Sequence, residues 1–220
     1  MIINYALSTA PYSDDVESCI NVMTASMFAL DKKSGDETEV ATCDFYIVDL
    51  VRASNITNCH DLLDVDGSIY HFVQILDDDY LLEESIEERN VEMCWGVCPE
   101  PDRLIVIHEL KVKKEHRGNK YSKALIEDFI ARFTSIYDII GLKAFPLEDR
   151  SEESVETLKG YYSKIGFKDV GIDDLMLWPT LEEPDWEEIL SETDQLMSSP
   201  KNAEHLEQSI AQYRENELRN

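Results

Sequence analysis

Basic residues are scarce in this sequence, and its first segment has none at all. The 220 residues include 20 Lys and Arg against 46 Asp and Glu, a formal net charge of −26, and no Lys or Arg precedes Lys32. The start therefore lacks the basic flank of a secretory signal and the arginines of a transit peptide. The uncharged run from Ser18 to Leu30 has thirteen residues, fewer than the roughly 20 that a membrane span needs. We expect a cytoplasmic protein.

Cysteines are also few, and their spacing excludes two common uses. The five cysteines are odd in number and scattered, which argues against a disulfide framework. Cys94 and Cys98 are separated by three residues, and no second Cys or His pair at finger-like spacing accompanies them; zinc sites need such a second pair. We therefore expect buried free thiols and no metal site.

The acidic surplus bears on the partners of the protein. With 43% hydrophobic residues, the chain can bury a core. The excess carboxylates repel nucleic acid and anionic membranes, because phosphate binding depends on cationic side chains. We expect neither direct nucleic-acid binding nor membrane binding, and cationic partners are favoured. A charge that only keeps the protein soluble explains the same composition.

The first part of the chain carries one helical and one strand pattern. Helical spacing predicts a helix over about 14–31. The apolar residues with this spacing are Ile20, Met23, Met27 and Leu30. Residues 38–53 are rich in β-branched and aromatic side chains, which predicts a strand.

The next segments predict two more strands around an acidic insertion. Residues 65–76 repeat the strand pattern, with Asp66 and Gly67 as a hairpin turn. The composition of the acidic insertion 77–90 predicts a solvated, partly helical segment. A third strand is expected near residues 91–98.

The second half has clearer periodicity. Residues 103–112 predict a central strand, 119–134 a helix that packs one face on the sheet, and 137–147 another strand. A strand, a helix and a strand in this order give a parallel pair. Residues 151–166 predict a helix capped by its first residue, a serine. Two closing strands follow within 167–178.

These elements predict an α/β (α+β) fold with a mixed, mostly antiparallel central sheet of about six or seven strands flanked by helices. Residues 1–180 form this domain. Residues 181–220 hold eleven acids and three bases, a net charge of −8, and two helical patterns separated by "SSPKN". We expect an acidic helical C-terminal extension, which is either an appended helical pair or an arm that binds a protein partner or a second copy of the chain.

Positive charge gathers in one place. Residues 111–125 carry six of the chain's 20 Lys and Arg. The central strand ends at Val112, a loop with Gly118 follows, and a helix begins near Lys120, so backbone N–H groups and the positive end of the helix converge. This arrangement predicts a phosphate site. Pairing of the same cations with surplus carboxylates is the alternative.

Two motifs resemble a known superfamily. The segment "HELKVKKEHRGNKYSKALIEDF" is similar to the acetyl-CoA-binding motif of the GNAT N-acetyltransferases, in which a strand leads into a loop of the form Arg/Gln-x-x-Gly-x-Gly/Ala. About forty residues on, "YYSKIGFKDVG" resembles their second signature, a Tyr followed by Gly-Phe at a helix end. The resemblance covers about residues 100–180. It implies a GNAT-like fold that uses acetyl-CoA (coenzyme A) as co-substrate, without a metal.

The resemblance also implies roles for individual residues. The backbone of Leu110 and Val112, with Lys111 between them, would pair with the pantetheine arm. Tyr162 would be the general acid that protonates the leaving thiolate, a role that suits a phenol. The pyrophosphate would be wrapped by the backbone N–H groups of Arg117, Gly118, Asn119, Lys120, Tyr121 and Ser122.

The base that collects the amine's proton is less defined. Glu109 is preferred, because the superfamily often places an acidic residue near this position, and His108 lies on the opposite face of the strand. Pairing of Glu109 with Lys111 and a core position for His108 are structural alternatives. Tyr161 adjoins Tyr162, but the Tyr-x-x-x-Gly-Phe spacing selects Tyr162.

The loop departs from the superfamily pattern at several positions. Glu115 stands where the pattern has Arg or Gln, and Val155 stands where Asn is often found seven residues before the Tyr. Lys120 and Ser122 replace Gly and then Gly or Ala. The side chain of Lys120 either blocks close approach of the pyrophosphate to the backbone or adds an ammonium that binds it.

The expected function is acetyl-CoA-dependent N-acetyltransferase activity on a primary amine of a cationic small molecule or a basic protein. Acidic residues would line the acceptor cleft, namely Asp14, Asp15, Asp173 and Asp174. The alternatives are a catalytically weak GNAT-fold interaction protein that uses its acidic surface, and an acidic decoy that mimics nucleic acid.

Overall fold

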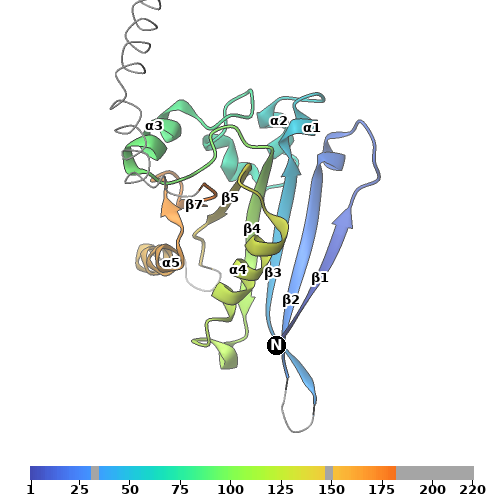
Figure 1. Cartoon of the computed structure of the whole chain (residues 1–220), viewed down its shortest axis with the longest axis vertical. Helices are drawn as coiled ribbons and strands as arrows, with labels where there is room; N and C mark the ends of the chain where they lie inside the picture. The colour runs from blue at the N-terminus through green and yellow to red at the C-terminus, as the bar shows by residue number, and fades with distance from the viewer. Residues whose placement is uncertain (31–34, 147–150, 182–220) are drawn as a thin grey trace, which may run out of the picture. The chain divides into compact units, whose positions relative to one another are not determined.

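The computed structural model describes residues 1–30, 35–146 and 151–181. These residues contain a seven-stranded sheet with the strand order β1-β2-β3-β4-β5-β7-β6 (Figure 1). All neighbouring strands are antiparallel except β4 and β5, which are parallel. The strands are β1 (Ile2–Thr9), β2 (Ile20–Leu30), β3 (Glu37–Asp49), β4 (Arg103–Val112), β5 (Asp138–Lys143), β6 (Lys168–Asp169) and β7 (Leu175–Trp178). The expected mixed, mostly antiparallel sheet is confirmed.

In the described part of the chain, five α-helices and three 3₁₀ turns connect the strands. They are η1 (Val16–Cys19), α1 (Leu50–Ala53), α2 (Cys59–Leu63), η2 (Tyr70–Gln74), α3 (Glu84–Met93), η3 (Lys114–His116), α4 (Tyr121–Phe133) and α5 (Glu152–Ile165). In the described residues, no helix is both long enough and apolar enough to cross a bilayer. The expected extension 181–220 lies, apart from its first residue, outside the described residues.

The prediction of a helix over 14–31 is wrong, because this segment forms η1 and then strand β2. Along β2, every second side chain from Met23 through Ala25 to Met27 is buried, which is the period of a strand. The strand pairs with β1 on one side and β3 on the other. Apolar residues spaced by three or four positions had imitated a helical face, and strand pairing overrides that pattern.

The predictions of strands over 65–76 and 91–98 are also wrong. Both segments belong to the chain between β3 and β4, which we call the insertion and which comprises α1, α2, η2 and α3. The segment 65–76 contains η2. Ile69, Phe72 and Ile75 are fully buried at intervals of three, which matches a 3₁₀ turn. The second segment is the end of α3 and a loop that the Asn90 side chain holds by bonding both the N–H and the C=O of Val97.

The elements of the second half are confirmed. Strand β4, helix α4, strand β5, helix α5 and the closing pair β6–β7 fall within the expected ranges. β4 and β5 pair in parallel from Arg103↔Asp138 to Ile107↔Leu142. The hydroxyl of Ser151 accepts a hydrogen bond from the N–H of Ser154 and caps α5, as expected. The strand predicted over 38–53 is also present, although it ends at Asp49 and α1 follows from Leu50.

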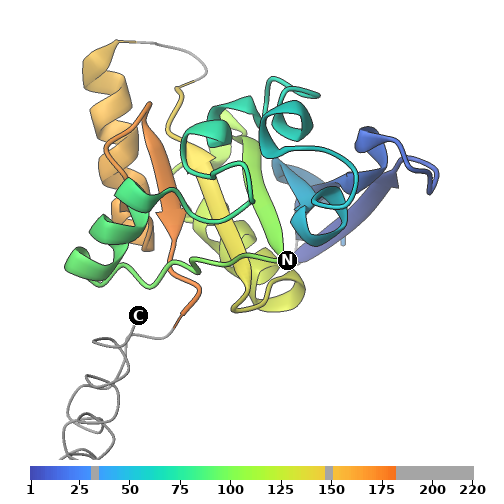
Figure 2. The same ribbon diagram turned by 90° about the horizontal axis from the view of Figure 1, so that it is seen from above.

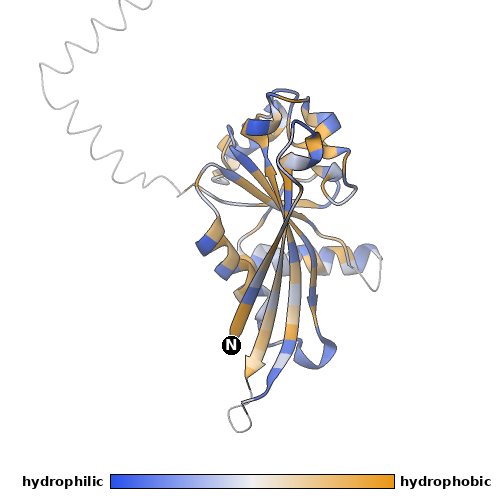
Figure 3. Ribbon diagram, turned by 90° about the vertical axis from the view of Figure 1, so that its right-hand side faces the viewer, coloured by the Kyte–Doolittle hydropathy of each residue, from blue (hydrophilic) through white to orange (hydrophobic). Residues whose placement is uncertain are grey.

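The sheet has a hydrophobic core on each face. In Figure 1, α1, α2 and α3 surround the upper end of the sheet, whereas α4 covers its middle strands and α5 lies beside β7. Seen from above in Figure 2, α5 lies at one end of the sheet and β1 at the other. Hydrophobic and hydrophilic residues alternate along the long strands in Figure 3. On β4, Val106 belongs to the core under the insertion, whereas Ile107 belongs to the core under α4 and α5.

A buried ion pair holds the start of β5. The Asp138 carboxylate is fully buried and accepts hydrogen bonds from Arg103 Nε (2.8 Å) and Nη2 (2.7 Å). It also accepts from the N–H of Ser135, which lies between α4 and β5. Because a buried carboxylate is costly unless paired, this network fixes the point at which β5 joins β4.

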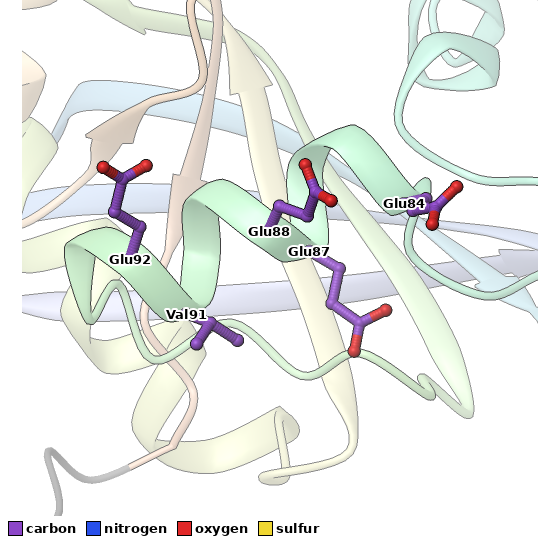
Figure 4. Close-up of a pocket in the computed structure, with 5 residues that line it drawn as sticks. All are labelled: Glu84, Glu87, Glu88, Val91 and Glu92. Atoms are coloured by element: carbon purple, nitrogen blue, oxygen red, sulfur yellow. The ribbon is translucent and has the colours of Figure 1, made fainter.

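The outer surface of α3 is acidic. A shallow depression of about 450 Å³ lies against this helix. Its lining residues are Glu84, Glu87, Glu88, Val91 and Glu92. Their side chains spread away from the helix in Figure 4. The lining contains no cation and no buried polar group, so we assign it to solvated surface.

Candidate active site

Strands β4 and β5 separate in the middle of the sheet. Their parallel pairing ends at Ile107↔Leu142, yet β4 continues to Val112. Within the described residues, positions 108–112 of β4 therefore have no strand partner on the side that β5 had occupied. A strand edge of this kind offers backbone N–H and C=O groups to an extended ligand.

A bulge at Glu109 changes the direction of the side chains at this point. Glu109 has φ +48°, and the β3–β4 register shifts between Thr42 and Asp44. As a result, His108 keeps the face of Val106, whereas Leu110 packs against the core under α4 and α5. Bulges re-aim side chains in this way and are common beside active sites.

A cleft of about 1400 Å³ opens where the strands separate. Ser68 and His71 of the insertion line it on one side of the sheet, and Tyr121 of α4 and Tyr162 of α5 line it on the other. The cleft therefore reaches both faces of the sheet. All the site residues expected from the sequence line it except Asn119, whose amide group donates to the carbonyl of His116 instead.

The loop between β4 and α4 has the backbone of an anion site. Gly118 has φ +84°, and Lys120, the N-cap of α4, has φ +61°. Among the described residues, no side chain caps the first turn of α4, so the leading N–H groups of this helix lack an acceptor from a capping residue. A Cβ at Gly118 would meet nothing within 4 Å, which means that the conformation, not space, calls for glycine.

Some of the cations around this loop form ion pairs with acidic residues, and others line the cleft. Lys113 lies 3.5 Å from Glu39, and Lys123 lies 3.4 Å from Glu127. Both pairs are exposed and contribute about 0–1 kcal/mol each. Lys113 does not line the cleft, whereas Arg117 and Lys120 do. Nε of Arg117 also donates to the carbonyl of Val112 at 3.3 Å.

Tyr161 and Tyr162 have different surroundings. The hydroxyl of Tyr161 is hydrogen-bonded to that of Ser122 and links α5 to the start of α4. Tyr162 is 8% exposed and lines the cleft, and no group in the described residues hydrogen-bonds its hydroxyl. Burial raises the pKa of Tyr162 above its ordinary value, with smaller contributions from Cys43 and Tyr161.

Glu109 is poorly placed to act as a base. Its side chain is 42% exposed and forms an ion pair with Lys111. The hydrogen bond and the charge of Lys111 hold the pKa of Glu109 below its usual range. A carboxylate with a lowered pKa is a weaker base than an ordinary one. The ion pair between Glu109 and Lys111, which is the structural alternative to a catalytic role for Glu109, is therefore present.

The acceptor cleft expected from four aspartates takes a different form. None of the four, Asp14, Asp15, Asp173 and Asp174, lines the cleft. Asp173 instead binds Lys143 Nζ (2.7 Å) and His71 Nδ1 (2.8 Å), and these two residues do line it. Sequence patterns missed Ser68 and His71 because they come from an insertion that had been assigned to a strand.

Metal-binding and disulfide chemistry find no support in the described part of the chain. It contains no group of three or more His, Cys, Asp or Glu side chains that could hold a metal ion. All five cysteines are free, and four of them are buried, whereas Cys94 is exposed. The expectation of buried thiols therefore holds for all except Cys94.

Comparison with known proteins does not assign the chain to a family. No family model matches the chain, and no solved structure gives a significant match. The class of protein must therefore be argued from the fold and the cleft.

Proposed function

We propose that this chain is a GNAT-type, acetyl-CoA-dependent N-acetyltransferase that acts on a primary amine. The observation that carries the proposal is the separation of β4 from β5 after Ile107↔Leu142, with an uncapped helix start on one side of the gap and Tyr162 beside it. The two sequence motifs fall at these two places. The motif resemblance and the cleft thus support the same substrate independently.

The β4–α4 loop suits the diphosphate of acetyl-CoA. Backbone N–H groups at Gly118, Tyr121 and Ser122 surround the uncapped start of a 13-residue helix, and a helix N-terminus favours anions. Lys120 occupies a left-handed position that glycine would take without strain. Its ammonium has no partner in the described part of the chain, so it is available to a phosphate.

The strand gap suits the pantetheine arm. This arm is extended and carries amide groups, and positions 110 and 112 of β4 offer backbone groups along an edge without a strand partner. Leu110, Val112 and Leu158 supply an apolar wall to the cleft. Binding of this kind needs no particular polar side chain.

Tyr162 suits the departing sulfur. The amine attacks the thioester carbonyl, the C–S bond breaks, and the thiolate takes the hydroxyl proton of Tyr162. A raised pKa makes a phenol a weaker acid in water, but the same apolar surroundings also raise the pKa of a thiolate beside it. Donor and acceptor are therefore shifted in the same direction, and the transfer remains feasible.

Calorimetry and thermal melting with acetyl-CoA test the proposal. At about 100 times its dissociation constant, a ligand that binds only the folded state stabilises it by about 2.7 kcal/mol. S-acetylpantetheine, which lacks the diphosphate, serves as the comparison ligand. We expect it to bind more weakly, because the loop contributes only to acetyl-CoA.

A pair of charge reversals locates the diphosphate. Arg117→Glu should weaken acetyl-CoA at least tenfold but leave S-acetylpantetheine unchanged. Lys113→Glu changes the charge equally in the same loop, but Lys113 does not line the cleft, so it serves as the matched control. No melting shift at millimolar acetyl-CoA would instead favour an interaction protein without catalysis.

A further inference from the structure

His108 lies on the side of the strand gap that faces the insertion. Its imidazole lines the cleft, and Nε2 lies 3.4 Å from the hydroxyl of Ser68. The edge of the ring meets Tyr46, with the ring centroids 5.7 Å apart and the planes at 86°. The side chain is 36% exposed, so these contacts hold it while solvent and ligands can still reach it.

Carboxylates surround this imidazole from three elements. Asp66, in the insertion, accepts the N–H of Ser68 at 2.8 Å. Asp44 is its register partner on β3 and is held by the hydroxyl of Thr24 at 2.7 Å. On β4 itself, Glu109 Oε1 lies 4.0 Å from Nε2. This negative charge around the imidazole attracts a cationic amine to it.

Asp66 keeps its charge in this arrangement. Burial raises the pKa of its carboxyl, but hydrogen bonds from Ser68 and Tyr46 and the charge of His108 outweigh burial, so the pKa is lowered overall. The ionised Asp66 accepts from the N–H of Ser68, and the hydroxyl of Ser68 lies 3.4 Å from Nε2 of His108. Asp66 therefore acts through Ser68 and His108, as a positioning residue.

The two residues that would transfer protons, Tyr162 and His108, lie on opposite faces of the sheet. Tyr162 belongs to the core under α4 and α5, whereas His108 follows Val106 on the opposite face. An amine that approaches from the insertion side meets His108 before it meets the thioester. We propose that His108, not Glu109, is the base that takes the acceptor amine's proton; this inference rests on the proposed acetyltransferase function.

The step balances as follows. The nitrogen lone pair attacks the thioester carbon, the new C–N bond forms, and the C–S bond breaks. His108 takes one N–H proton, and the thiolate takes the hydroxyl proton of Tyr162. His108 then releases its proton to solvent, and Tyr162 regains one. The net products are an amide and coenzyme A thiol.

The test measures thiol release from acetyl-CoA by the full chain. The acceptors are spermidine, a lysine-rich peptide, and water alone. His108→Ala should lower kcat about 100-fold, the lower end of the range for general-base catalysis, while the KM for acetyl-CoA stays within twofold. His108→Gln, which keeps a polar side chain of similar size, should lose the same activity. Added imidazole should restore part of it to His108→Ala only.

A matched control and a binding measurement separate the outcomes. His60→Ala removes an exposed histidine on α2 that does not line the cleft, and its kcat should equal that of the unmodified chain. The proposal is overturned if either His108 variant turns over normally, or if Glu109→Gln abolishes turnover and His108→Ala does not. If acetyl-CoA neither binds nor releases thiol with any acceptor, the acetyltransferase function itself fails, and this role fails with it.

Discussion

Removing one oxygen atom from Tyr162 separates its chemistry from its packing. The ring is 8% exposed and meets Phe167 edge-on at 5.7 Å. The described residues provide no hydrogen-bond partner for the hydroxyl. Tyr162→Phe therefore keeps the packing and leaves no donor or acceptor unpaired.

The expected effect on stability is small. The hydroxyl opens on the cleft and is not a buried unpaired group, so its removal should be nearly neutral, within about 1 kcal/mol. The expected effect on turnover is large. Loss of a general acid lowers the rate about 100-fold, which corresponds to about 2.7 kcal/mol in the activation free energy.

Urea denaturation and thiol release from acetyl-CoA measure the two quantities on the same preparation. The affinity for acetyl-CoA, measured by calorimetry, should not change. Tyr161→Phe is the matched control, because the Tyr161 hydroxyl is hydrogen-bonded to Ser122 and has no role in the proposed protonation of the sulfur. Normal turnover by Tyr162→Phe would refute the reasoning, and destabilisation by several kcal/mol would mean that the hydroxyl has a structural partner.

Three further predictions concern the loop, the buried ion pair and alkaline pH. Lys120→Gly should raise the free energy of unfolding by about 1 kcal/mol in urea, because it relieves a positive φ, and should weaken acetyl-CoA roughly 10-fold in calorimetry by removing the ammonium; unchanged affinity would exclude a role for that group. Asp138→Asn should cost about 3 kcal/mol in urea, against less than about 1 for the more exposed Asp128→Asn. Burial raises the pKa of Cys59 to about 12, so the folded state keeps a proton that the unfolded state loses. Stability should then fall between about pH 9 and 12, by up to about 1.4 kcal/mol per pH unit for this group, and Cys59→Ala should flatten this fall in pH-dependent melting.

The accuracy of the sequence-based predictions differs between the two halves of the chain. From Arg103 to Trp178, helices and strands have the lengths and periods that their residues favour, and every element expected in this range is present. Before that point, the sequence pattern predicts a helix where β2 forms and a strand where η2 forms. The β2 pattern satisfies both periods, and only its two neighbouring strands decide between them.

The candidate site shows the same division. The loop around Gly118 and the position of Tyr162 could be predicted, because a phosphate-binding turn and a helix-end signature are local in sequence. The role of Glu109 could not be judged locally, since its bulge and its ion pair with Lys111 depend on the register with β3. Ser68 joins the site from an insertion for which no motif exists.

The sequence alone determined the β4–α4–β5–α5 order and the local concentration of positive charge, because periodicity and composition act over neighbouring residues. The tertiary structure alone decided where β4 leaves β5, which face each side chain meets, and which acids surround His108. These features depend on contacts between residues far apart in the chain. Such contacts form only when the strands pair and the two cores close, so no short stretch of sequence contains them.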